Sequence, residues 1–298
     1  MTGLRHQVEN IIREELDKAQ VTVPWDMNEI HVLPDSKAVI EYTSSAGSLS
    51  EALVEHYFPA EPAGARFSHF TSMDSFKSIL ASNELRLGAL IRKVNQQEFR
   101  PFSEDFGLSG YLDETDGEPY FKSLMADLFY TSFTTTEPDD PDYMWQVFGR
   151  QYRGVKITFE ISPIRSRAEL RKVRYCSATD AAKSLIASIM RRIKEECNRH
   201  FIMRGISRIG AFYLPLGYSL EREDETRLLV KSWGVGPAHD LISGNGDEAY
   251  IPLAFGSGGN EFCMLNIVEV QAGAQSDRTE IERALAASKF SKVPCGDA

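Results

Sequence analysis

Residues 66–87 change their hydrophobic period twice, and this change constrains the fold more than any other stretch of the sequence. An aromatic-rich run at 66–71 predicts a short strand. Apolar residues then recur at the i, i+3 and i+4 spacing of a helix within 76–80, and Asn83 is placed to end that helix. From 85 to 87 the period falls to two again, so the sequence predicts a strand–helix–strand unit.

His69 and Thr71 lie where the first strand of this unit passes into its helix. Thr71 stands three residues before Asp74, which is similar to a capping box and predicts that Thr71 begins the helix. Backbone N–H groups at a helix N-terminus favour an anionic ligand such as a phosphate, and a histidine there can donate or accept a hydrogen bond near neutral pH. One hypothesis is therefore a ligand-binding His69, and the other is a strand-end side chain with structural contacts alone.

The overall charge argues against one class of function. At 298 residues the chain can form two average domains or one large one, and its formal net charge is −10. A nonspecific nucleic-acid coat needs a basic face, so this charge disfavours one, although it is compatible with a local basic pocket. The sequence shows no signal peptide and no apolar run of about 18 residues, so we expect a soluble, cytoplasmic protein with no membrane partner.

The cysteines and histidines predict no metal site. The four cysteines are far apart and no C-x-x-C occurs, so free thiols in a reducing compartment are the simplest interpretation. The six histidines are scattered, and none belongs to an H-E-x-x-H pattern. The aspartates at 139, 140 and 142 do cluster, which raises a divalent-cation hydrolase as a hypothesis. However, Asp140 before Pro141 is a typical helix cap before a typical first helical residue, and we favour that interpretation.

The first sixty residues differ from the rest of the chain. We expect a helix over 3–20, with an apolar stripe along one side, and then a β-hairpin before residue 43. Prolines on either side of Ala60 stop regular structure. The sequence thus predicts residues 1–60 as an N-terminal helix-plus-hairpin attachment and residues 61–298 as a core α+β domain. The N-terminal helix could form a homodimer or dock a partner, and the sequence leaves both open.

Three further helices are predicted in the core. One follows Pro141, carries an aromatic side over 143–152 and is expected to stop at Gly154. A second runs from about 181 to 203, because its apolar residues recur every four positions. The last is expected to begin with a capping box at Thr279 and to continue through Phe290.

Residues 128–134 predict a strand with one face rich in hydroxyl groups. Tyr130, Ser132 and Thr134 share this face with Leu128. A row of hydroxyls suits the wall of a ligand cleft better than a core. An ordinary half-exposed strand would carry the same pattern, so both interpretations stay open.

The sharpest charge pattern lies at 221–230. If this segment is extended, Glu223, Glu225 and Arg227 project from one face, with the two carboxylates roughly 7 Å apart. Such carboxylates repel each other unless something lies between them, and Arg227 can neutralise one. One hypothesis is a functional pair in which one carboxylate meets a developing cation. The other is an exposed edge strand whose charges prevent aggregation.

Five short motifs occur in a fixed order along the chain. They are an H-F-T-S opening, an asparagine and a glutamate in a loop, an S-F-T at a strand end, an M-W before G-V-K-I-T-F, and an E-x-E-x-R. Their positions are His69–Ser72, Asn95 and Glu98, Ser132–Thr134, Met144–Trp145 with Gly154–Phe159, and Glu223–Arg227. In this order they resemble a widespread bacterial family known only as domain of unknown function 2971, over about residues 67–287.

The order of parts in that family looks like the ADP-ribosyltransferase fold, an α+β fold with a mixed or split antiparallel sheet and peripheral helices. The resemblance implies that His69 and Thr71 hold the adenosine-side or nicotinamide ribose of NAD. It also implies that Tyr130 or Ser132 lines the nicotinamide pocket, with Arg227 in the same NAD site. The catalytic carboxylate would be Glu225 or, failing that, Glu223.

The first functional hypothesis is therefore an NAD-dependent ADP-ribosyltransferase or NAD glycohydrolase, such as a bacterial toxin or phage-defence effector. NAD would be its substrate, and the acceptor could be a protein, a nucleic acid or water. The alternative is a non-catalytic module on the same scaffold that binds a nucleotide or a protein. The metal-dependent hydrolase ranks third, because no ligand spacing supports it.

Overall fold

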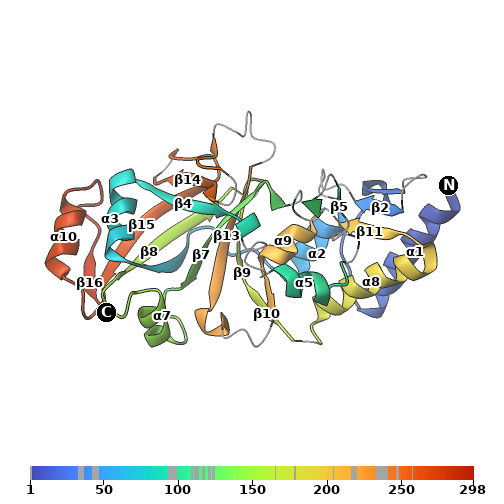
Figure 1. The fold of residues 1–298 in the computed structure, drawn as a ribbon, viewed down its shortest axis with the longest axis horizontal. Coiled ribbons are helices and arrows are strands. Elements are labelled where there is room, and N and C mark those ends of the chain that lie inside the picture. The colour runs from blue at the N-terminus through green and yellow to red at the C-terminus, as the bar shows by residue number, and fades with distance from the viewer. Residues whose placement is uncertain are drawn as a thin grey trace. The chain divides into compact units, whose positions relative to one another are not determined.

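The structure, a computed structural model, describes residues 2–32, 37–41, 47–92, 99–108, 110, 114–115, 118–119, 122, 125–164, 166–177, 179–203, 205–215, 220–232, 241–245, 248–256 and 258–298. Asn95, Glu98 and the predicted turn at 34–36 lie outside this part of the chain. The chain divides into two compact units (Figure 1). Unit 1 comprises Met1–Pro59, Leu90–Ala126 and Arg174–Leu216, and unit 2 comprises Ala60–Ala89, Asp127–Val173 and Gly217–Ala298.

The first boundary falls between Pro59 and Ala60, next to the position inferred from the prolines. Unit 1 also takes in two later segments, which the sequence assigned to a core domain of 61–298. The N-terminal hairpin explains the second of these, Arg174–Leu216. Its second strand, β2 (Ala38–Glu41), pairs on one side with β1 (Ile30–Val32) and on the other, in parallel, with β11 (His200–Met203). A two-stranded hairpin is only marginally stable alone, and β11 supplies the third strand.

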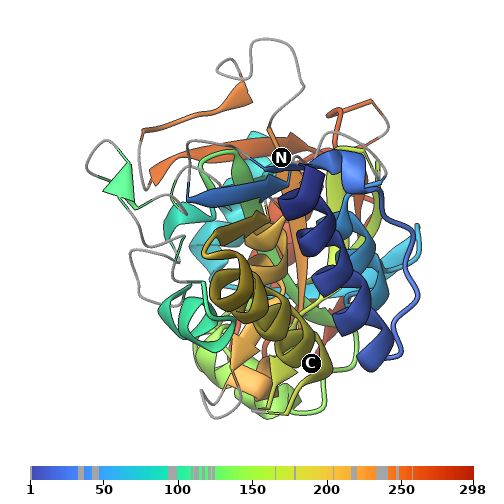
Figure 2. The same cartoon turned by 90° about the vertical axis from the view of Figure 1, so that its right-hand side faces the viewer.

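Unit 1 combines short sheets with helices. Its other elements, in chain order, are α1 (Thr2–Lys18), η1 (Met27–Glu29), α2 (Leu49–Tyr57), α5 (Phe99–Asp105), β5 (Glu114–Thr115), β6 (Glu118–Pro119), β10 (Arg174–Cys176), α8 (Ala181–Cys197), α9 (Ile206–Ala211) and β12 (Tyr213–Pro215). Figure 2 shows α1 beside α8, the packing that buries the predicted apolar stripe of α1. Arg192 on α8 joins the two helices through ion pairs to Glu14 and Glu15, both at 2.9 Å.

Unit 1 contains a buried carboxyl group at Glu41, the last residue of β2. Its side chain is fully buried and accepts hydrogen bonds from the Ser50 backbone N–H at 2.9 Å and from the Ser50 hydroxyl. Burial outweighs these bonds and raises the pKa of Glu41 from 4.5 to about 7. Between pH 4.5 and about 7, the folded chain therefore keeps the proton of Glu41, whereas the unfolded chain releases it.

We expect the free energy of unfolding to fall as the pH rises from 4.5 to about 7, the two pKa values of Glu41. This contribution is fully present below the unfolded pKa and is lost as the pH passes the folded one, an effect of about 3 kcal/mol. The measurement is urea unfolding across this range for the wild type and Glu41→Gln. The variant should lack this decline, and parallel profiles for the two proteins would contradict the assignment.

Unit 2 is built on one large sheet. Its elements, in chain order, are β3 (Ala65–Thr71), α3 (Met73–Ser82), β4 (Glu84–Ala89), β7 (Leu128–Thr135), α7 (Pro141–Val147), β8 (Val155–Pro163), β9 (Ala168–Lys172), η3 (Leu220–Glu223), β13 (Glu225–Lys231), β14 (Tyr250–Ala254), β15 (Cys263–Ala272), α10 (Arg278–Ala286) and β16 (Cys295–Asp297). The predicted strand–helix–strand unit is confirmed as β3, α3 and β4. An ion pair between Lys77 and Glu280 joins α3 to α10.

The sheet follows the order β14-β4-β7-β3-β8-β15-β16, with β13 on the other edge of β7 and β9 beyond β13 (Figure 1). All of these neighbours are antiparallel except β15 and β16. The chain is therefore an α+β protein with a mixed, largely antiparallel sheet, as the sequence predicted. Among the helices of the described residues, none has the length and apolar character that a bilayer crossing requires.

The sheet divides at β7. One edge of this strand pairs with β13 from 128 to 134. The opposite edge pairs with β4 at 129 and 130 and with β3 at 134 and 135. Residues 131–133 therefore lie on that edge between two partner strands, a stretch we call the fork. Positions at a sheet opening can present polar groups that a continuous ladder would consume.

Two helices begin at residues other than those predicted. Ser72, rather than Thr71, caps α3, and its hydroxyl accepts the N–H three residues on at 3.1 Å. Thr71 is instead the last residue of the β3 ladder, opposite Val155. Asp277, rather than Thr279, caps α10 in the same way at 3.2 Å. Each predicted capping residue lies within two positions of the true one, a shift that a sequence pattern does not resolve.

Several helices end earlier than predicted. α1 ends at Lys18 and α10 at Ala286, and left-handed residues follow α8 directly and α7 three positions on. α8 ends at Cys197, because Asn198 takes φ 51° and the chain turns into β11. α7 ends at Val147, and residues 150–152 have φ of 52°, 56° and 64°. A residue in this conformation stops a right-handed helix. The aromatic side predicted for a longer helix at 143–152 is therefore divided between α7 and the turn after it.

Candidate functional site

The centre of the candidate site is a buried ion pair on β13. This strand is buried along its whole length, and Glu225 and Arg227, two residues apart, project from the same face. Arg227 Nε donates to Glu225 Oε1 and Arg227 Nη2 to Glu225 Oε2, both at 2.7 Å. The two side chains are 5% and 1% exposed. This bidentate geometry gives the carboxylate the charge compensation that an interior position demands.

Strand β7 adds a hydroxyl group and an aromatic ring to this pair. Ser132 is directly opposite Arg227 in the register, and its hydroxyl donates to Glu225 Oε1. The guanidinium carbon of Arg227 lies 5.5 Å from the centre of the Tyr130 ring, which is a cation–π contact. Thr134, opposite Glu225, has a buried hydroxyl without a hydrogen-bond partner among the described residues. The predicted hydroxyl-rich face therefore meets the buried charges of β13.

His69 reaches the same cluster through the fork. Its Nδ1 lies 3.0 Å from the carbonyl oxygen of Ser132. A carbonyl oxygen only accepts, so Nδ1 must carry the proton and donate. Burial lowers the pKa of His69, and the bond to Ser132 offsets this only in part. The neutral ring therefore has its lone pair on Nε2, where it can accept a hydrogen bond from a ligand hydroxyl.

The site combines buried charges with more accessible groups. Glu225 and Arg227 are buried, while His69, Tyr130 and Ser132 are half-buried. The hydrogen bonds run from His69 to the Ser132 carbonyl and from the Ser132 hydroxyl to Glu225. Three strands that are far apart in sequence thus hold an imidazole, a hydroxyl and a carboxylate in one connected arrangement. Such an arrangement can hold a carboxylate in one position beside a ligand that contacts the half-buried residues.

Two predicted site residues lie outside this arrangement. Among the described residues, no hydrogen bond joins Thr71 to Ser132 or Glu225, and Thr71 is set at the end of β3 opposite Val155. A Cβ atom added to Gly154 would lie 2.2 Å from the carbonyl oxygen of Thr71, so only glycine fits at position 154. Thr71 is thus positioned by its packing against β8.

The prediction that Glu223 and Glu225 share one strand face is wrong. Glu223 is the last residue of the 3₁₀ helix η3, and β13 begins only at Glu225. Asp224 between them has φ 44° and forms an ion pair with Lys172 at 2.5 Å. A left-handed residue interrupts the strand alternation, so the face of Glu223 is not set by that of Glu225. Glu225 alone belongs to the buried site.

Sequence reasoning missed a second ion pair on the same face. Glu169 and Arg171 on β9 are 4% and 2% exposed, with Arg171 Nε donating to Glu169 Oε2 at 2.8 Å. Arg171 lies opposite Arg227 in the register, and Lys231 Nζ lies 2.6 Å from Glu169 Oε1. The signal was present in the sequence, because E-L-R at 169–171 repeats the E-T-R of 225–227.

The aspartate cluster has structural contacts. Asp140 caps α7, accepting the Tyr143 N–H at 2.9 Å, so the favoured interpretation is confirmed. It also accepts from Arg222 Nε at 2.9 Å, and these two contacts lower the pKa of Asp140. Asp142 accepts from the Tyr152 hydroxyl at 2.8 Å. Within the described ranges, no group of three or more His, Cys, Asp or Glu side chains is arranged to hold a metal ion.

The arrangement suits a reaction in which positive charge develops on a bound ligand. A fixed carboxylate stabilises such charge without reorganisation, and an aromatic ring beside it offers a flat surface for a planar ligand group. Comparison with protein-family models, with curated proteins and with solved structures finds no match for this chain.

Proposed function

We propose that unit 2 binds NAD and cleaves its nicotinamide–ribose bond, as an ADP-ribosyltransferase or an NAD glycohydrolase. The observation that carries the proposal is the hydrogen-bonded connection of His69, Ser132 and Glu225 across three strands. These are the imidazole, hydroxyl and carboxylate that the resemblance in the sequence assigns to NAD. The division of the sheet at β7 also fits the split sheet of that fold.

Glu225 is the proposed catalytic carboxylate. When the C–N bond breaks, its electron pair leaves with neutral nicotinamide and positive charge develops on the ribose. A carboxylate held in place stabilises that charge, and a single group of this kind contributes roughly 3–4 kcal/mol. Arg227 and Ser132 supply the hydrogen bonds that hold Glu225 in one position. In the completing step an acceptor oxygen attacks the ribose carbon and gives its proton to Glu225 or to solvent.

The half-buried residues around Glu225 are the proposed binding groups. The Nε2 lone pair of His69 accepts a hydrogen bond from a ribose hydroxyl, and the Tyr130 ring packs on the nicotinamide. Thr71 pairs with β8, so its proposed role in NAD binding is to position β3, which carries His69. The acceptor is a protein, a nucleic acid or water, and an effector of toxin or phage-defence type is the proposed biological role.

The direct test is incubation of the purified chain with NAD labelled in the nicotinamide ring. The expected result is release of free nicotinamide, either with water alone or after addition of a protein or nucleic-acid extract as acceptor. Absence of release under all three conditions would overturn the proposal. With NAD labelled in the adenine ring instead, label that becomes attached to protein or to nucleic acid would identify the class of the acceptor.

Replacing His69 with alanine is expected to raise KM for NAD by about tenfold and to change kcat much less. The reason is that one hydrogen bond to the ribose, about 1.4 kcal/mol, is lost in both ground and transition states. Steady-state nicotinamide release measures both constants. His6→Ala, at an exposed position on α1, is the matched control. A loss confined to kcat would instead place His69 in the chemical step.

One observation favours a second candidate function, a non-catalytic nucleotide- or protein-binding module. Both oxygens of Glu225 are already bonded to the Arg227 guanidinium. Glu169 is paired in a similar way with Arg171 and Lys231. In a binding module both carboxylates would have a structural role in the sheet. A binding module would raise its melting temperature with NAD without releasing nicotinamide. The shift should persist in Glu225→Gln under either function, so the absence of nicotinamide release from the wild type is what separates a binding module from the enzyme.

A further inference from the structure

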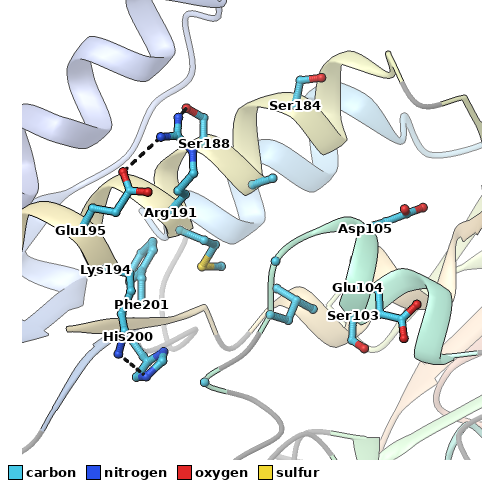
Figure 3. Close-up of a pocket in the computed structure, with 15 residues that line it drawn as sticks. Ser103, Glu104, Asp105, Ser184, Ser188, Arg191, Lys194, Glu195, His200 and Phe201 are labelled. Atoms are coloured by element: carbon cyan, nitrogen blue, oxygen red, sulfur yellow. Dashed lines mark hydrogen bonds and ion pairs between the residues drawn. The ribbon is translucent and has the colours of Figure 1, made fainter. Parts of the chain in front are cut away.

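Unit 1 contains a cavity of about 780 Å³ between α8 and the C-terminal end of α5 with the chain that follows it. Figure 3 shows Lys194, His200 and Phe201 on one side and Ser103, Glu104 and Asp105 across from them. All of its lining residues belong to unit 1. This volume lies in the range of about 300–1,000 Å³ that small-molecule sites occupy.

The cations of α8 near this cavity differ in their partners. Arg191 pairs with Glu195 at 3.1 Å, Arg192 with Glu196 at 2.6 Å, and Lys183 with Asp105 at 2.8 Å. Lys194 has no carboxylate partner in the described part of the chain. Its Nζ lies instead 2.7 Å from His200 Nε2. An ammonium group cannot accept a hydrogen bond, so Lys194 donates and His200 accepts.

The chain itself fixes His200 beside Lys194. A Cβ on Gly110 would lie 2.7 Å from His200 Cβ and 2.9 Å from His200 Nδ1. Only glycine therefore allows the backbone to approach the imidazole ring this closely. The ring in turn holds the Lys194 ammonium at the edge of the cavity, with its charge uncompensated by the described side chains.

The lining of this cavity is mixed, with Glu104, Asp105, Arg191 and Glu195 beside an apolar part. Leu108, Met190 and Phe201 line the cavity, and Ala187 lies one turn before Arg191 on the same side of α8. Each of the first three is less than a tenth exposed, so their cavity-facing atoms form a preformed floor. A cation next to an apolar floor is the arrangement that complements a ligand with one anionic group and an apolar body.

We propose that this cavity is a binding site for a small amphipathic anion. The carboxylate or phosphate of the ligand meets Lys194, and its apolar body lies over Leu108, Met190 and Phe201. The size of the cavity fits a medium-length acyl chain or a small ring system. This site is independent of the NAD proposal, because every group that forms it belongs to unit 1.

The test is isothermal titration of the full chain with three probes, namely sodium octanoate, octyl phosphate and octylammonium. One saturable site is expected for at least one of the two anions, with octylammonium at least tenfold weaker. Lys194→Gln should weaken anion binding by about tenfold or more, because a hydrogen bond to a charged group is lost. Tighter binding of octanoate assigns a carboxylate ligand, and tighter binding of octyl phosphate assigns a phosphate.

Matched variants separate this site from nonspecific binding. Lys292→Gln removes another exposed lysine, one that belongs to unit 2, and should leave the affinity unchanged, while Gly110→Ala should weaken binding by displacing His200. Glu225→Gln should bind the anion as the wild type does, whatever its effect on NAD. The proposal is overturned if neither anion saturates, or if Lys194→Gln and Lys292→Gln bind as tightly as each other.

Discussion

Replacing Arg227 with methionine is expected to lower the free energy of unfolding by about 3–5 kcal/mol. The side chain of Arg227 is 1% exposed and makes two hydrogen bonds to Glu225. Methionine fills a similar volume, so the loss comes from the Glu225 carboxylate, which would stay buried without its guanidinium. Urea unfolding, followed by circular dichroism, measures the difference from the wild type.

An exposed arginine provides the control for this variant. Arg222 pairs with Asp140, but its side chain is 57% exposed, so Arg222→Met should cost less than about 1 kcal/mol. The double variant Glu225→Leu with Arg227→Met removes both charges and should be more stable than Arg227→Met alone. Equal losses for Arg222→Met and Arg227→Met would mean that the buried pair does not stabilise unit 2.

Elements whose pattern is local were predictable from the sequence. The helix α3 and the strands β3 and β4 follow from a change of period within 66–87, and β7 from alternation along the strand, whereas β13 was considered only as one possible conformation of 221–230. The pairing of Arg227 with Glu225 also followed, because residues two apart in a strand share a face. These predictions depend only on residues within one element, which is why they hold.

The predictions that failed, and the features that were missed, depend on backbone conformation or on contacts between distant segments. Glu223 was placed on the strand, since a strand pattern does not show that Asp224 takes a left-handed φ. The fork needs β7 to meet β3 and β4 at once, and no local period encodes this. Arg171 was missed although E-x-R occurs twice, because its burial follows from β9 pairing with β13.

The largest effect on activity is expected for Glu225→Gln, with kcat for nicotinamide release reduced by about 100-fold or more. Glutamine keeps the shape and can still accept from Ser132, but it lacks the charge that stabilises the developing cation. The proposed NAD-cleavage assay measures kcat and KM for the variant and the wild type. KM should change little, because the carboxylate acts on the charge that develops after binding.

Glu169→Gln is the control, because Glu169 is buried and paired much as Glu225 is, with Lys231 as a further partner. The two side chains are 4% and 5% exposed, and each bonds an arginine two residues on. Both variants therefore remove one buried charge, and Glu169→Gln, which also takes a partner from Lys231, should lose at least as much stability as Glu225→Gln. Only Glu225 accepts a hydrogen bond from Ser132, whose carbonyl oxygen holds His69, so Glu169→Gln should keep kcat within about threefold of the wild type. A parallel loss of activity in both variants would mean that the effect follows the folding of the sheet, and Glu225 would then be a scaffold residue.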